Sequence, residues 1–144
     1  AVGRARDGPE ALLVAGYLGL LPWPAHVVEV REAAARPDRR RLEGEALLAA
    51  VPAGATVVAL DPKGQALSSE AFARRVARWR DGGVRNLAFV IGGADGLAPA
   101  VLARADARLS LGPMTWPHLL ARVLLAEQLW RAASLLAGHP YHRR

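Results

Sequence analysis

The stretch TVVALDP, residues 56–62, decides the fold class of this chain. Its first five residues form an unbroken apolar run, which Asp61-Pro62 ends. A continuous apolar run of this length is typical of a strand that is covered on both faces, as in a parallel sheet. We therefore predict a buried parallel strand over residues 56–60, followed by a turn at Lys63-Gly64.

Helices and strands are predicted to alternate along the rest of the chain. After this strand we expect a helix that begins at Ser68 or Ser69 and ends at Gly82, a strand over residues 86–91, a short helix over 99–103, a strand over 107–111 and a long helix over 117–137. Before it we expect a helix from an Asp7 N-cap to Leu18, a strand over residues 26–31 and a helix from an Asp38 cap to Ala50. Residues 1–3 resemble the end of a first strand, whose start we expect to precede Ala1.

This order predicts an α/β fold, with a mainly parallel five-stranded sheet and helices on both faces. A chain of 144 residues can bury one core but not two full domains, so we expect a single domain over residues 1–144.

The charge is unbalanced, with 19 Lys and Arg against 13 Asp and Glu, a formal net charge of +6. Lys63 is the single lysine, and this preference for arginine is what a GC-rich genome produces. The positive excess itself indicates a polyanionic partner, with nucleic acid favoured over an anionic membrane surface.

Several chemistries are excluded by composition. The chain has no cysteine, which removes disulfides, thiolate metal sites and cysteine nucleophiles. The four histidines, at positions 26, 118, 139 and 142, place no pair on one helix, so we predict no metal site. The start has no signal-peptide pattern, and charged or polar residues interrupt the longest apolar segment, residues 119–136. We therefore expect a cytoplasmic protein without a membrane span.

The loop GGADG, residues 92–96, follows a predicted central strand. Ligands bind beyond the carboxyl ends of parallel strands, and glycines let the backbone approach a ligand closely. The spacing does not match a dinucleotide fingerprint. The alternative is a tight turn without a ligand.

The loop LGPMTWP, residues 111–117, combines one glycine and two prolines with apolar residues. A rigid loop with apolar side chains of this kind suits the binding of a flat aromatic ring. The alternative is a rigid turn in which Met114 and Trp116 fill the core.

The long helix has polar residues on two roughly opposite lines. A step of about 100° per residue puts His118 and Arg122 on one line, and Glu127, Arg131 and Ser134 on the other. The remaining positions are mostly apolar, which indicates a subunit interface. The Glu127 and Arg131 pair, at i and i+4, either stabilises the helix or holds a polar ligand.

The ending HPYHRR, residues 139–144, places an aromatic ring among cations. Such a segment is either a solvated terminus or one that stacks on a base and neutralises phosphate. Further basic groups, at residues 36 and 39–41 and at residues 74, 75 and 78, are most simply solvated faces.

Together, LDPKGQ, FVIGGADGL, LSLGPMTWPHLLARVLLAEQLWRA and the ending HPYHRR resemble the RlmH (YbeA) family of ribosomal RNA methyltransferases, of the SPOUT class. The resemblance covers essentially the whole chain, including the opening AVGRARDGPE. The block over residues 114–132 and the HPYH ending are its most specific parts.

The resemblance implies an α/β fold with a C-terminal trefoil knot, an exception to the rule against threaded chains. It also implies a homodimer that uses S-adenosylmethionine, without a metal, to methylate N3 of a pseudouridine in a large-subunit (23S-type) rRNA stem-loop on the assembled ribosome. No DNA or membrane partner is implied.

Site residues follow from the resemblance by position. The residues that match cofactor-binding segments are Leu60, Gly92, Gly93, Gly96, Leu111, Gly112, Pro113, Met114, Thr115, Trp116 and Pro117. Those that match polar positions near the methyl-transfer site are His118, Glu127, Arg131, Tyr141, His142 and Arg143, with one subunit's tail completing the other's site. Ala94-Asp95 departs from the Pro-Glu of many members, which puts a role for that carboxylate in doubt.

The reaction needs alignment of the methyl group and removal of the imide proton. His118, His142 or ionised Tyr141 could act as the base, and the sequence does not rank them. Arg131 and Arg143 are expected to orient the base and its phosphates, because guanidinium stays protonated. The alternatives are a SPOUT enzyme that acts on a tRNA or another rRNA position, and a catalytically silent RNA-binding or ribosome-associated adaptor.

Overall fold

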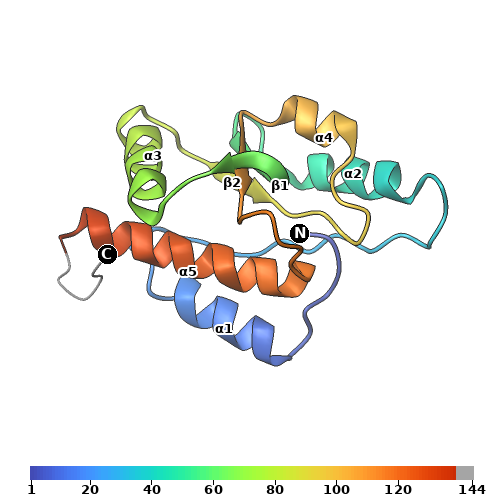
Figure 1. Ribbon diagram of the computed structural model, residues 1–144, viewed down its shortest axis with the longest axis horizontal. Coiled ribbons are helices and arrows are strands. Elements are labelled where there is room, and N and C mark those ends of the chain that lie inside the picture. The colour runs from blue at the N-terminus through green and yellow to red at the C-terminus, as the bar shows by residue number, and fades with distance from the viewer. Residues whose placement is uncertain (139–144) are drawn as a thin grey trace.

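Strand β1 (Thr56–Ala66) is the centre of a three-stranded parallel sheet in the computed structural model, which describes residues 1–138. It lies between β2 (Leu87–Val90) and β3 (Ala107–Ser110), in the order β2-β1-β3. Ala59 pairs with Val90, and Leu60 pairs with Leu109. The predicted α/β class with a parallel sheet is therefore confirmed (Figure 1).

Alternate residues of β1 supply two separate cores. Val57 and Ala59 pack with α2 (Arg39–Ala50) and α4 (Pro99–Arg104). Val58 packs with α3 (Ser69–Asp81) and α5 (His118–Leu136). Helices thus cover both faces of the sheet, as predicted (Figure 1).

Helix α1 (Pro9–Leu18) packs on α5. The rings of Tyr17 and Trp130 lie 5.7 Å apart between these two helices. Much of the apolar surface of α5 is therefore covered by α1 and α3 of the same chain.

The prediction of five strands is wrong for the described residues 1–138, in which the sheet has three. The two other expected strands are reduced to one parallel bridge between Val2 and Val30. Val2 N–H donates to Ile91 O at 3.1 Å and Gly3 N–H to Val30 O at 2.9 Å, so residues 1–3 do lie beside the end of β2. The Val2 and Gly3 carbonyls accept from the Arg122 side chain instead of from a neighbouring strand.

The predicted turn at Lys63-Gly64 is also wrong, because β1 continues to Ala66 after an irregularity between Leu60 and Gln65. Within the irregularity, Asp61 Oδ1 accepts from Lys63 N–H at 3.1 Å. A Cβ on Gly64 would lie 2.7 Å from the Arg108 carbonyl carbon, so glycine is needed where β1 rejoins β3.

Helix ends follow the sequence closely. Ser68 caps α3 and accepts from Ala71 N–H at 3.1 Å. The left-handed residue after α3 is Gly83, at φ +83°, one residue beyond the predicted Gly82. The predicted Asp7 cap of α1 is wrong, since Gly8 occupies the cap without a side-chain bond. Asp38 caps α2 by position only, and its carboxylate pairs with Arg36 and Arg41 instead.

Candidate functional site

Three chain segments meet at the carboxyl edge of the sheet because the strands are parallel and in register. β1 places half-buried Leu60 beside Leu109, one residue after Ala59 has paired with Val90. The loops over residues 92–96 and 111–117 leave the neighbouring strands at this same edge. The two loops predicted to bind the cofactor therefore follow the ends of β2 and β3, on either side of Leu60 in β1, at the edge where parallel sheets bind ligands.

The loop over residues 92–96 is tightly packed on one side and open on the other. A Cβ on Gly92 would lie 2.7 Å from the Gly96 carbonyl carbon, and one on Gly93 would lie 3.0 Å from Val2 Cγ1. Gly96 closes the turn by donating its N–H to Gly93 O at 3.0 Å. It has φ +76°, and no atom lies within 4 Å of the position of its missing Cβ. This backbone is held close to the core while its far end faces open space.

Helix α2 supports this loop through a buried carboxylate. Glu43 is 2% exposed, and its two oxygens lie 3.1 and 3.2 Å from where a Gly93 Cβ would be. Gly44 lets the helix backbone approach α4, since a Cβ there would lie 2.8 Å from Ala98 Cβ. Arg39 lies between Glu43, at 3.9 Å, and Asp95, at 3.3 Å. Asp95 therefore ties the loop to α2. This residue, which differs from the glutamate of many family members, thus has a structural partner in Arg39.

The loop over residues 111–117 is held by its own polar groups. Ser110 Oγ accepts from Gly112 N–H at 3.0 Å, and Trp116 Nε1 donates to Leu111 O at 3.3 Å. Gly112 has φ +104°, which only glycine adopts readily. Met114 is 72% exposed and Trp116 is 42% exposed, so the alternative in which they fill the core is wrong.

The polar residues of α5 fall into two groups that lie apart. His118 begins the helix, and its Nε2 lies 3.5 Å from where a Gly3 Cβ would be. Glu127 accepts from Arg131 Nε at 3.0 Å, farther along the same helix. At about 1.5 Å per residue, the Cα atoms of His118 and Glu127 are roughly 13 Å apart along the axis. A single chain does not bring them together, and Tyr141, His142 and Arg143 lie outside the described residues.

Comparisons with known proteins agree along nearly the whole chain. A family model described as a predicted SPOUT methyltransferase matches residues 1–142. The chain is 59% identical to ribosomal RNA large subunit methyltransferase H of Rhodospirillum centenum, over 99% of this chain and 95% of that relative. Relatives with the same name from Paramagnetospirillum magneticum and Xanthobacter autotrophicus are 54% and 53% identical over the same shares. The chain belongs to the SPOUT methyltransferase family. The RlmH group predicted from sequence is confirmed.

One arrangement in this SPOUT chain was not predicted from the sequence. The Arg122 side chain is 5% exposed and donates to Glu29 Oε2 and to the Val2 and Gly3 carbonyls. Glu29 Oε2 also accepts from Ala5 N–H at 2.8 Å. The Arg122 hydrogen bond, and then that of Ala5, hold the pKa of Glu29 below its usual value. The only sequence signal was a charged residue in an otherwise apolar helix segment.

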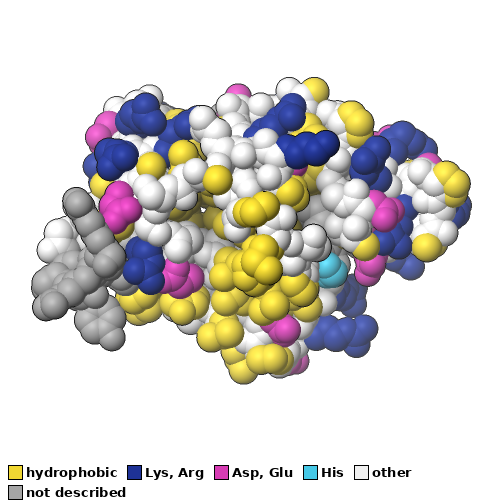
Figure 2. Space-filling view, viewed as in Figure 1, with side chains coloured by type: hydrophobic (Ala, Val, Ile, Leu, Met, Phe, Trp, Pro, Cys, Tyr) yellow, Lys and Arg dark blue, Asp and Glu magenta, His cyan; other side chains and the backbone are white. Residues whose placement is uncertain are grey.

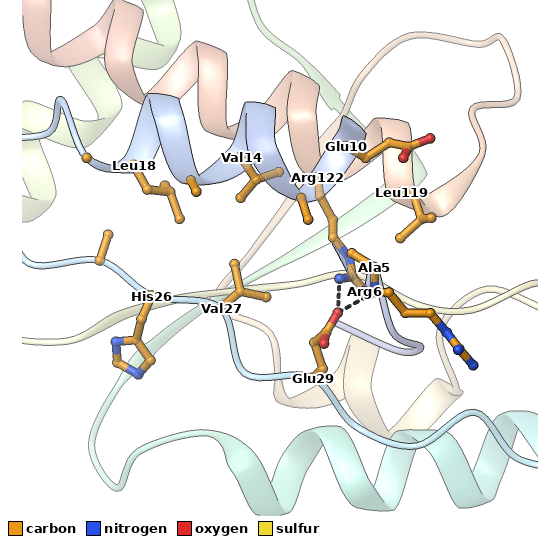
Figure 3. Close-up of a pocket in the computed structure, with 14 residues that line it drawn as sticks. Ala5, Arg6, Glu10, Val14, Leu18, His26, Val27, Glu29, Leu119 and Arg122 are labelled. Atoms are coloured by element: carbon orange, nitrogen blue, oxygen red, sulfur yellow. Dashed lines mark hydrogen bonds and ion pairs between the residues drawn. The ribbon is translucent and has the colours of Figure 1, made fainter. Parts of the chain in front are cut away.

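Arg122 and Glu29 lie at one end of a cavity of about 470 Å³ between α1 and residues 25–29 (Figure 3). Val14, Leu18 and Val27 line its apolar part. None of the candidate cofactor residues lines this cavity, so it is distinct from the sheet edge of the SPOUT fold.

The surface of this SPOUT chain carries an apolar area over α1 and the first half of α5 (Figure 2). Leu12 is 70% exposed, Leu13 49% and Leu120 40%. Of these, Leu120 is close in sequence to the 111–117 loop. Within residues 1–138 no group of three or more His, Asp or Glu could hold a metal. In the same range no helix is long and apolar enough to cross a membrane.

Proposed function

We propose that this chain uses S-adenosylmethionine to methylate N3 of a pseudouridine in a large-subunit rRNA stem-loop, on the assembled ribosome in the cytoplasm. The observation that carries the proposal is the shared edge of the sheet, at which the two loops follow β2 and β3 on either side of Leu60 in β1. The names of the relatives, matched over nearly their whole length, support large-subunit rRNA as the substrate.

The residues at this edge fit S-adenosylmethionine. Gly96 and Gly112 have positive φ and open space at the Cβ position, so backbone groups there are accessible to a ligand. The exposed side chains of Met114 and Trp116 offer apolar surface for an adenine ring. When bound, the cofactor supplies a sulfonium methyl group that is already activated for transfer.

The chain's own residues have the tasks of alignment and proton removal. His118 directly follows the 111–117 loop and is one candidate base, beside Tyr141 and His142. Arg131 donates Nε and Nη2 to the same Glu127 oxygen, which uses one edge of its guanidinium. The end of the guanidinium that carries Nη1 is suited to orient a base or a phosphate.

We propose that the enzyme works as a homodimer. His118 and the Glu127–Arg131 pair lie too far apart along α5 for one chain to form one site from them, and a second copy supplies what is missing, including its residues 139–144. The exposed apolar residues of α1, Leu120 and Met114 support such an interface. We also propose that the C-terminal part of the chain forms a trefoil knot that includes these two loops. Sedimentation as a monomer at micromolar concentration would contradict the dimer.

Mass spectrometry of rRNA tests the substrate. A strain that lacks this protein is expected to lose one methyl group on one large-subunit pseudouridine, and complementation with the wild-type chain to restore it. Loss of a methyl group from tRNA or from another rRNA position would instead support the alternative substrates.

A second test concerns the C-terminal tail. Arg143→Ala is expected to lower methylation of whole ribosomes, and full activity in this variant would show that the tail is not part of the site.

Thermal unfolding with S-adenosylmethionine tests the cofactor. A ligand that binds only the native state raises its stability, by about 2.7 kcal/mol at a concentration 100 times Kd. An unchanged unfolding temperature at millimolar cofactor would favour the silent adaptor.

A further inference from the structure

An unbroken chain of side-chain hydrogen bonds joins α3 to the Glu127–Arg131 pair of α5. Ser69 Oγ donates to Gln128 Oε1 at 2.7 Å, and Gln128 Nε2 donates to Glu127 Oε2 at 3.0 Å. Arg131 Nε then donates to Glu127 Oε1 at 3.0 Å. Ser69 and Gln128 are 59 residues apart in the sequence, so this chain forms only when the two helices are packed.

The consequence for Glu127 is that donors on both sides hold its carboxylate. Arg131 occupies one oxygen and Gln128 the other, which fixes the plane of the carboxylate as well as its position. The Glu127 side chain is 19% exposed and that of Arg131 is 31% exposed. Hydrogen bonds in such partly buried networks are stronger than in water and depend on one another.

The consequence for Arg131 is a fixed direction. A guanidinium whose Nε and Nη2 both donate to one carboxylate oxygen presents its remaining end along a defined axis. Without Gln128, Glu127 could rotate, and the guanidinium would move with it. Ser69 acts one step earlier, because it holds the Gln128 amide in the orientation that points its NH₂ group at Glu127.

We infer that Gln128 and Ser69 are positioning residues for methyl transfer, which act through Glu127 to aim Arg131 at the rRNA. This inference rests on the proposed function. It assigns neither residue to contact with substrate or cofactor.

Neighbouring Ser68 provides a matched control. Its hydroxyl accepts from Ala71 N–H at the start of α3 and takes no part in the chain to Glu127. Ser68→Ala and Ser69→Ala thus remove the same atom from adjacent residues, one with a capping role and one with a positioning role.

The test is steady-state methylation of ribosomes by the full-length chain, with kcat and the KM for S-adenosylmethionine measured separately. Ser69→Ala and Gln128→Met are expected to lower kcat by roughly 3- to 10-fold, because the aim of Arg131 is lost, with the cofactor KM unchanged. The double variant is expected to be no slower than the worse single variant, since both act on one chain. Ser69→Thr, which keeps the hydroxyl, is expected to retain activity.

Ser68→Ala is expected to lower the unfolding temperature and leave kcat unchanged. Wild-type kcat in both Ser69→Ala and Gln128→Met would overturn the positioning role, as would an equal loss of kcat in Ser68→Ala. A wild-type chain that binds S-adenosylmethionine but methylates no rRNA would instead overturn the proposed function, and the inference with it.

Discussion

Arg122 of α5 and Glu29 form an ion pair that fastens the long helix to the N-terminal part of the chain. The Arg122 side chain is 5% exposed, and it also donates to the Val2 carbonyl at 3.0 Å and the Gly3 carbonyl at 2.9 Å. One side chain thus satisfies a carboxylate and two backbone acceptors from segments more than 90 residues away. Residues 1–3 are held beside β2 by this arginine as well as by backbone bonds.

Replacing Arg122 with methionine is expected to lower the free energy of unfolding by about 3 kcal/mol, because it leaves the Glu29 carboxylate and the buried Val2 and Gly3 carbonyls without their donor. Urea denaturation measures this loss. Arg80→Met is the matched control, since Arg80 pairs with Asp81 at the surface, where such pairs contribute about 0 to 1 kcal/mol. Equal losses in the two variants would show that Arg122 has no special structural role.

Acid is expected to weaken the same contact. The pKa of Glu29 is lowered in the folded chain, chiefly by the Arg122 hydrogen bond, so its contribution to stability is complete above the unfolded pKa of about 4.3. That contribution is lost as the pH falls below this value and through the lower folded pKa. Glu29→Gln is expected to flatten the fall of unfolding temperature between about pH 5 and pH 3. Asp106, whose pKa is lowered by the Val57 N–H and then by Arg104, leaves a residual slope. Identical slopes in the two proteins would contradict this.

The sequence predicted the central part of the fold better than its margins. The run over residues 56–60 has one buried face for each of two cores, so its apolar pattern was informative. Residues 26–31 look equally strand-like, yet Val27 and Val28 are 43% and 47% exposed and only Val30 forms a bridge. Whether such a segment forms a strand depends on its pairing partners. A local pattern does not reveal that the distant Arg122 binds the carbonyls of Val2 and Gly3, the residues beside this segment.

The candidate site also has one part that the sequence predicted and one part that it did not. The two glycine-containing loops could be predicted because turns with unusual backbone conformations require glycine or proline, and these residues are visible in the sequence. The residues behind them were missed: Glu43 under Gly93, and Gln128 beside Glu127, look like ordinary polar residues of helices. Their roles depend on the packing of α2 against α4 and of α5 against α3, which no local pattern encodes.

The ion pairs behind the 92–96 loop are expected to be unequal in strength. Arg39→Met leaves the Glu43 carboxylate, 2% exposed, without its cation, and is expected to lower the free energy of unfolding by about 3 kcal/mol. Asp95→Asn removes a partner that is 53% exposed, and is expected to cost below about 1 kcal/mol. Urea denaturation distinguishes the two. Arg39→Met combined with Glu43→Gln is expected to recover part of the loss, and an additive double variant would show that the two side chains are not coupled.

Gly96 and Gly54 allow a direct test of whether the 92–96 loop binds the cofactor. Both have φ +76°, and at both the Cβ position has no atom within 4 Å. Alanine is therefore expected to cost the same backbone strain at each position, about 1 kcal/mol, as measured by urea denaturation. Gly54 lies in the turn before β1, whereas Gly96 belongs to the loop at the carboxyl edge. Calorimetric titration with S-adenosylmethionine is expected to show affinity weakened roughly 10-fold by Gly96→Ala, because the new methyl group and the strained turn disturb the backbone that faces the ligand. Gly54→Ala is expected to bind like the wild type. Equal affinities in the two variants would place the cofactor away from this loop, and the sheet edge would lose its main support as the site of methyl transfer.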